Sequence, residues 1–133
     1  MAKVMIVDDE KDHTYFMRVL LEKQGFEVLE AYNGREAYDQ LTAAVGQSVL
    51  PDVLLVDVMM PEMDGCALQL KLQEDERLKQ LPVIMMTAKE QMTDSIKCLT
   101  GVFGFIEKPF ETQTLLSMVK NAVVSKENPA GDR

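Results

Sequence analysis

The feature that most restricts the fold is a repeated alternation between short apolar runs and longer stretches of helical periodicity. Short runs of this kind are typical of parallel strands that helices cover on both faces. Strands are expected at Lys3–Val7, Val53–Val56, Val83–Met86 and Phe103–Ile106, with a more exposed one at Glu27–Glu30. Together with the intervening helices they predict five β-α units in an α/β fold.

Five helices are expected beside these strands, because apolar residues between the runs recur every three or four positions. Asn33 can cap the start of the second helix, and Gly25 is a stop signal for the first. The expected positions are Thr14–Leu21, Asn33–Leu41, a helix after Asp64-Gly65, Gln91–Thr100 and Thr112–Val124. Right-handed crossovers then favour a doubly wound parallel sheet, with the ligand site at the carboxyl ends of the strands.

The length of 133 residues fits one compact domain. We assign residues 1–125 to this domain and 126–133 to a polar tail or the start of a linker. The formal net charge of -8 argues against direct binding of nucleic acid or anionic lipid. Because the run Val4–Val7 near the N-terminus is too short for a membrane span or a signal-peptide core, we expect a cytoplasmic location.

Polar residues of four kinds follow the predicted strands at the point where each strand ends. Asp8-Asp9-Glu10 follows the first strand, Asp57 the third, Thr87 the fourth and Lys108 the fifth. The carboxyl ends of parallel strands meet at one edge of the sheet, so we expect these side chains to converge there.

Three carboxylates in one place repel each other unless a cation neutralises them. Hard oxygen ligands favour Mg²⁺, with Mn²⁺ as the alternative, so Asp8, Asp9 and Asp57 predict a metal site. Mg²⁺ is usually completed by a phosphate oxygen and water. A metal and Lys108 would supply positive charge while Asp57 supplies a nucleophile and Thr87 a hydrogen-bond donor, which indicates phosphoryl transfer.

Each of these residues also has an ordinary interpretation when it is taken alone. The acidic run after the first strand can cap the first helix, and the other residues can serve turns and loop ends. We interpret Cys66 and Cys98 as packing thiols and the cluster of Met59, Met60 and Met63 as loop packing. The placement of all these acidic, threonine and lysine residues at one edge of the sheet is what favours phosphoryl transfer.

Four segments resemble the motifs of response-regulator receiver domains. They are VMIVDDE at Val4–Glu10, DVLLVDVMMPEMDG at Asp52–Gly65, VIMMTA at Val83–Ala88 and FIEKPF at Phe105–Phe110. The resemblance spans nearly the whole chain and implies a flavodoxin-like fold with strand order 2-1-3-4-5. It also implies a switch in a two-component system, phosphorylated by a sensor histidine kinase or a histidine phosphotransfer protein.

The resemblance also assigns roles to particular residues. It implies that Asp57 accepts the phosphoryl group, that Thr87 and Lys108 assist, and that Thr87 is coupled to Phe105, an aromatic switch in the fourth and fifth units. The implied metal ligands are Asp9 directly, Asp8 partly through water, Asp57, and the backbone carbonyl of Met59. We expect Phe103 to be buried, which would leave Phe105 free to move.

Met59 and Lys89 occupy the places that, in this family, influence the lifetime of the aspartyl phosphate. Our hypothesis is that Met59 shields the acyl phosphate from water, because an apolar side chain cannot orient an attacking water. Lys89 would stay solvated or contact the phosphoryl group.

Three other functions were weighed against a receiver. A haloacid-dehalogenase-like phosphohydrolase needs a second acid two residues after the nucleophile, where this chain has Met59. A flavodoxin-like cofactor binder needs a phosphate loop that the acidic residues after the first strand would repel. An interaction module without phosphorylation would not need the acidic residues, the threonine and the lysine that phosphoryl transfer requires, and this chain has all of them. We therefore expect a signalling switch rather than an enzyme. Its partner would be an output protein or an effector domain outside this chain. Dimerisation on phosphorylation is a further alternative.

Overall fold

The computed structural model describes residues 2–47, 49–60, 62–88 and 101–127. Five strands form one parallel sheet in the order β2-β1-β3-β4-β5. They are β1 (Lys3–Val7), β2 (Glu27–Ala31), β3 (Val53–Asp57), β4 (Val83–Ala88) and β5 (Val102–Lys108). The predicted doubly wound, flavodoxin-like fold and its strand order are confirmed.

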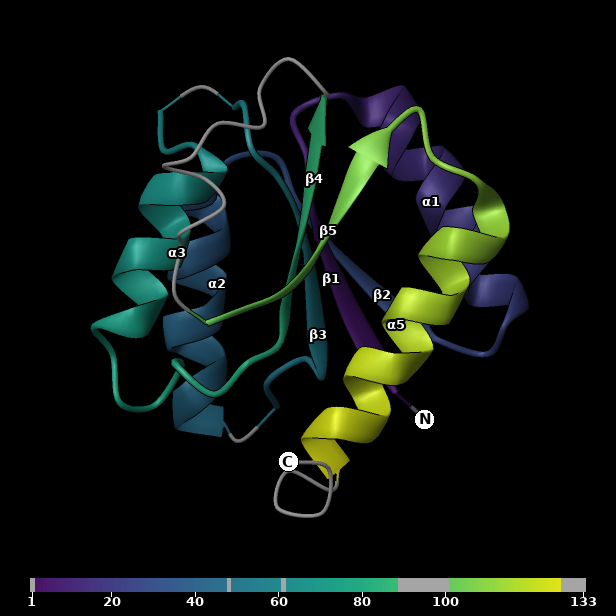
Figure 1. The fold of residues 1–133 in the computed structure, drawn as a ribbon. Helices are drawn as coiled ribbons and strands as arrows, with labels where there is room; N and C mark the ends of the chain where they lie inside the picture. The colour runs from purple at the N-terminus through teal and green to yellow at the C-terminus, as the bar shows by residue number, and fades with distance from the viewer. Residues whose placement is uncertain (1, 48, 61, 89–100, 128–133) are drawn as a thin grey trace.

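Helices cover both faces of this sheet in the described residues (Figure 1). They are α1 (Lys11–Lys23), α2 (Gly34–Gln47), α3 (Gly65–Gln73) and α5 (Thr112–Glu127). Helices α1 and α5 lie on one face, and α2 and α3 lie on the other. The predicted helix Gln91–Thr100 lies outside the described residues. None of the described helices is long and apolar enough to cross a membrane.

Helix boundaries follow local capping and propensity. The side chain of Asp64 accepts a hydrogen bond from the amide of Ala67 and so caps α3, as the Asp-Gly signal suggested. Asn33 likewise accepts from the amide of Glu36 at the start of α2. This helix continues to Gln47 rather than ending at Leu41, because residues 42–45 contain no glycine or proline and Gly46 comes only at its last turn. Helix α5 reaches Glu127, two residues into the predicted tail.

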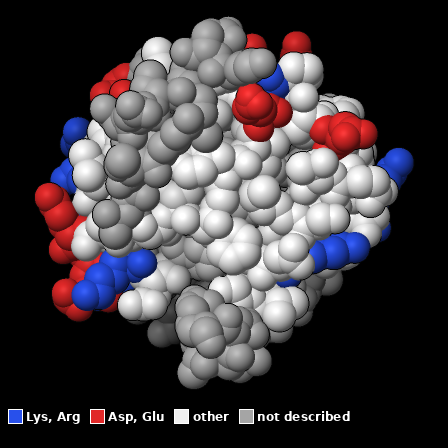
Figure 2. Space-filling view, viewed as in Figure 1, with Lys and Arg blue, Asp and Glu red and all other residues white. Residues whose placement is uncertain are grey.

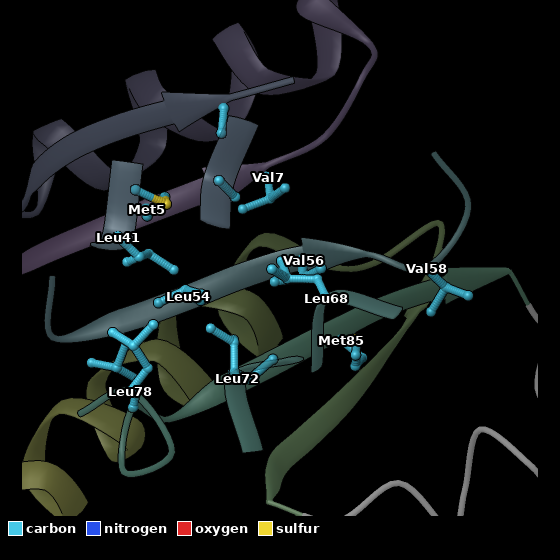
Figure 3. Packing of buried hydrophobic residues seen from close by; sticks show 14 residues of the cluster. Met5, Val7, Leu41, Leu54, Val56, Val58, Leu68, Leu72, Leu78 and Met85 are labelled. Carbon is cyan, nitrogen blue, oxygen red and sulfur yellow. The ribbon is translucent and has the colours of Figure 1, made fainter. Parts of the chain in front are cut away.

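The core consists of two layers, one on each face of the sheet. Successive residues of β1 alternate between them: Met5 and Val7 face α2 and α3, whereas Val4 and Ile6 face α1 and α5. Figure 3 shows the first layer, where side chains from β1, β3 and β4 pack against those of α2 and α3. This double burial explains why the strands are continuous apolar runs, and it fixes the positions of their carboxyl ends.

The edge strand β5 departs from the expected alternation. The prediction that Phe103 is buried is wrong, because its side chain is 39% exposed, while Phe105 is partly buried against the core under α2 and α3. The pairing steps from Val83 opposite Val102 to Ile84 opposite Gly104, so Phe103 is an extra residue in a β-bulge. A bulge interrupts the alternation of faces, which separates the two phenylalanines.

Candidate functional site

The ends of β1 and β3 bring three carboxylates together. Asp8 and Asp9 follow β1 directly, and Asp57 is the last residue of β3. The three residues offer carboxylate oxygens that all lie within 4.8 Å of one another. Asp8 and Asp57 are buried, whereas Asp9 is exposed. The sequence-based prediction that these carboxylates converge at the carboxyl edge is therefore met in their placement.

Lys108, the last residue of β5, reaches across β4 to this cluster. Its Nζ lies 3.2 Å from Oδ2 of Asp57, and both side chains are largely shielded from solvent. The peptide bond that joins Lys108 to Pro109 is cis. The ion pair places a mobile positive charge beside the carboxylate that the sequence identified as a nucleophile.

Burial raises the pKa of Asp57 above its ordinary value, and the nearby charge of Asp8 raises it further. The positive charge of Lys108 and a hydrogen bond from the backbone N–H of Met59 act in the opposite direction. Desolvation has the larger effect, so ionisation of Asp57 is disfavoured in the metal-free site. A divalent cation bound here would favour the ionised carboxylate.

The donors at this site fit a hard divalent ion. Asp8, Asp9 and Asp57 offer oxygen ligands, two of them buried, and exposed Asp9 leaves one side open to water. This oxygen set and an open side are what Mg²⁺ requires when it retains several waters. The residues present therefore fit the predicted metal, and the backbone carbonyl of Met59 remains a predicted further ligand.

Thr87 and Met59 lie on either side of the cluster. Asp57 pairs with Met86 across the sheet, so Thr87 is one residue beyond it, and its side chain is buried. The Thr87 hydroxyl donates to the carbonyl of Ala88 at 3.0 Å. Met59 is 57% exposed, although its amide contacts Asp57. Lys89 lies outside the described residues.

One residue near the cluster was not identified from the sequence. Nδ1 of His13, in the first turn of α1, lies 2.6 Å from Oδ2 of Asp8. The other oxygen of Asp8 accepts a hydrogen bond from the amide of Glu10 at 2.9 Å. A signal was present, because His13 lies only five residues after Asp8, in the first turn of the helix that was expected to follow the acidic run.

The chain matches the sequence model of the family described as "Response regulator receiver domain" over residues 4–120. The chain belongs to the response regulator receiver domain family. Receiver domains are signalling switches of two-component systems, and they accept phosphoryl groups from histidine kinases. The acidic cluster at the carboxyl edge of this receiver domain could bind a metal ion.

Two curated relatives match most of this chain. Protein PilH of Pseudomonas aeruginosa is 35% identical over 126 residues, which are 94% of this receiver domain and 99% of PilH. The phosphate regulon transcriptional regulatory protein PhoB of Rhizobium meliloti is 35% identical over 121 residues, 90% of this chain. The match covers 51% of PhoB, so this receiver domain spans about half the length of that relative.

Two solved structures of similar proteins have the same fold as this chain. The receiver domain of a signal transduction histidine kinase from Syntrophus aciditrophicus superposes with a TM-score of 0.84 at 29% identity, covering 100% of this chain and 98% of that one. The chemotaxis protein CheY4 of Vibrio cholerae superposes with a TM-score of 0.78 at 32% identity, covering 92% and 98%.

Proposed function

We propose that this receiver domain accepts a phosphoryl group on Asp57 in a Mg²⁺-dependent reaction, with a histidine kinase or a histidine phosphotransfer protein as donor. The observation that carries the proposal is the pairing of a buried carboxylate with Lys108 at 3.2 Å, beside the carboxylates of Asp8 and Asp9. A structural ion pair would not need two further acids at the same point, because each of them adds repulsion to the buried carboxylate.

The chemistry follows from these positions. A carboxylate oxygen of Asp57 attacks the phosphorus of a phosphohistidine, an O–P bond forms, and the N–P bond breaks as the imidazole nitrogen takes up a proton from solvent. Lys108 starts paired with the Asp57 carboxylate and moves its charge to a phosphoryl oxygen as negative charge develops there. When bound by Asp8, Asp9 and Asp57, Mg²⁺ supplies positive charge to the phosphoryl oxygens; Mn²⁺ is the alternative ion.

Phosphorylation of Asp57 would change the conformation of residues on β4 and β5. Thr87 is buried one residue beyond the partner of Asp57, and Phe105, opposite Met85 on β5, is partly buried. We propose that a hydrogen bond from the Thr87 hydroxyl to the phosphoryl group opens space for Phe105. This movement would alter the edge of the sheet at β5, beside the face formed by β5 and α5.

That face suits contact with a protein partner. Figure 2 shows it as a broad area with few charged side chains, which lie mainly at its margins. Half-exposed Phe103 and residues of α5, among them Gln113 and Met118, line a shallow pocket there. We propose that a cytoplasmic output protein, or an effector domain outside this chain, binds here. The overall negative charge disfavours nucleic acid as the partner.

The deciding experiment is the intact mass of the protein after incubation with acetyl phosphate, with and without Mg²⁺. We expect one phosphoryl adduct that requires Mg²⁺ and is absent in Asp57→Asn. Asp39→Asn, an exposed acid on α2, is the matched control and should form the adduct normally. An adduct of equal yield in Asp57→Asn, or none in wild type across several small donors, would overturn the proposal.

A further inference from the structure

A second group of metal-ligating side chains lies beside the Mg²⁺ site and includes the single histidine of the chain. Asp8, Glu10 and His13 offer two carboxylate oxygens and one imidazole nitrogen, all within 4.8 Å of one another. Glu10 is the residue before α1, and His13 follows it by one helical turn. Glu10 has an extended backbone and is not itself helical, but its carboxylate and the His13 ring both lie within reach of one ion.

The imidazole is held in an orientation suited to binding. Its ring packs against Phe110 with the ring centroids 5.6 Å apart, and Nδ1 faces Oδ2 of Asp8 at 2.6 Å. Two ligands on a tetrahedral Zn²⁺ lie roughly 3.3 Å apart, given metal–ligand distances of about 2.0 Å. An ion could therefore replace the proton between Asp8 and His13 if the two atoms separated by less than about 1 Å.

Access and outer contacts also suit an ion. A pocket lined by Glu10, His13, Phe16 and the Lys108–Phe110 segment opens to solvent beside the group. The pocket gives an entry path and room for water as a fourth ligand. Oδ1 of Asp8 is oriented by the Glu10 amide, and Lys108, the cation in this pocket, is directed toward Asp57.

We propose that Asp8, Glu10 and His13 form a binding site for a divalent transition ion such as Zn²⁺, and that this ion excludes Mg²⁺ from the neighbouring carboxylates. An imidazole ligand favours Zn²⁺ over Mg²⁺, whereas Asp9 and Asp57 add oxygen donors alone. Asp8 belongs to both groups. Two divalent ions that share one carboxylate a few ångströms apart repel each other, so occupation of one site weakens the other.

The consequence for signalling rests on the proposed function. If Asp57 accepts phosphoryl groups with the help of Mg²⁺, then Zn²⁺ at the His13 site slows acceptance. The site would make the receiver sensitive to transition ions, a second input beside phosphorylation.

Binding is tested first, with Zn²⁺ alone and tag-free protein. We expect calorimetry to give one Zn²⁺ site, and the His13 ring protons, the single histidine signals in the NMR spectrum, to shift on saturation. His13→Gln should weaken Zn²⁺ binding by at least about tenfold to a hundredfold, the loss that removal of a ligand's outer partner already causes, and Glu10→Gln should weaken it too. Asp12→Asn, an exposed acid in the same turn, is the matched control and should bind Zn²⁺ as wild type does.

Two variants test whether the Zn²⁺ and Mg²⁺ sites are distinct. Asp9→Asn should lose Mg²⁺ affinity and keep Zn²⁺ affinity, whereas His13→Gln should lose Zn²⁺ affinity and keep Mg²⁺ affinity. Equal Zn²⁺ affinity in wild type and His13→Gln, or His13 signals that do not shift, would overturn the site.

Antagonism is tested by adduct formation with acetyl phosphate at fixed Mg²⁺ while Zn²⁺ is raised. Adduct formation by wild type should slow as Zn²⁺ is raised, whereas adduct formation by His13→Gln should not. Equal slowing in both proteins would overturn the antagonism. Failure of any adduct without Zn²⁺ would instead contradict the proposed function, while the binding experiments would still decide the Zn²⁺ site.

Discussion

Gly65 lies so close to Asp57 that a β carbon on it would be 2.5 Å from the carbonyl oxygen of Asp57. The next contact would be the backbone of Val58 at 3.0 Å, and the amide of Gly65 donates to the Val58 carbonyl at 2.8 Å. The start of α3 is thus packed directly on the end of β3. Gly65 holds the backbone of the proposed phosphoacceptor in place.

Gly65→Ala is expected to lower the free energy of unfolding by about 1 to 3 kcal/mol, because the atoms that it meets are backbone atoms and cannot move independently. Phosphoryl acceptance should slow as well, since the displaced atom belongs to Asp57. Gly46→Ala, in α2 with nothing within 4 Å, is the control and should be neutral or stabilising by up to about 1 kcal/mol. Urea unfolding would measure both, and equal effects of the two substitutions would contradict the close-packing argument.

Lys108→Met retains the length of the side chain and removes its charge. Without this cation the pKa of Asp57 should rise further, because Lys108 is the largest influence that lowers it. The rate of adduct formation should fall on the order of 10²-fold, as when one charge-stabilising donor is removed from an active site. Lys120→Met, on the exposed side of α5, should leave the rate unchanged. A wild-type rate in Lys108→Met would show that Lys108 is structural.

Much of this architecture was predictable because the governing signals are local. Double burial makes the parallel strands continuous apolar runs, so β1 was placed at Lys3–Val7 without error. Parallel strands also share one carboxyl edge, and that rule alone predicts that Asp8, Asp57 and Lys108 lie together.

The features that escaped prediction depend on contacts between distant segments. The bulge at Phe103 arises where β5 pairs with β4, and nothing in the sequence of β5 alone marks an extra residue. His13 could be placed on α1, but its contact with Asp8 depends on how α1 leaves β1 and on Phe110 from the far end of the chain. The length of α2 exceeded the prediction because residues 42–45 contain no stop signal, and Gly46 is tolerated in the last turn of the helix.

The stability of the metal-free protein should depend on pH through Asp57. Burial raises the pKa of this carboxyl above 3.8, so the contribution of Asp57 to folding is greatest below about that pH and is lost as the pH rises through the raised value. Asp57→Asn does not ionise, so its advantage in melting temperature over wild type should grow with pH and then level off. Mg²⁺ should reduce this advantage by stabilising the ionised wild type. A difference that stays constant from about pH 4 to 7 would contradict the raised pKa.

The lifetime of the aspartyl phosphate should depend on the side chain of Met59. This residue is 57% exposed and its amide donates to Asp57, so a substitution changes the surface beside the acyl phosphate while the backbone contact remains. Met59→Asn places an amide that can orient water where a thioether cannot, and we expect hydrolysis to accelerate severalfold. Met59→Leu retains an apolar side chain of similar volume and should retain the wild-type lifetime. Both are measured by the decay of the intact-mass adduct after removal of the donor. If the Asn and Leu variants decay at the same rate, Met59 does not shield the phosphoryl group, and water must reach it from another side.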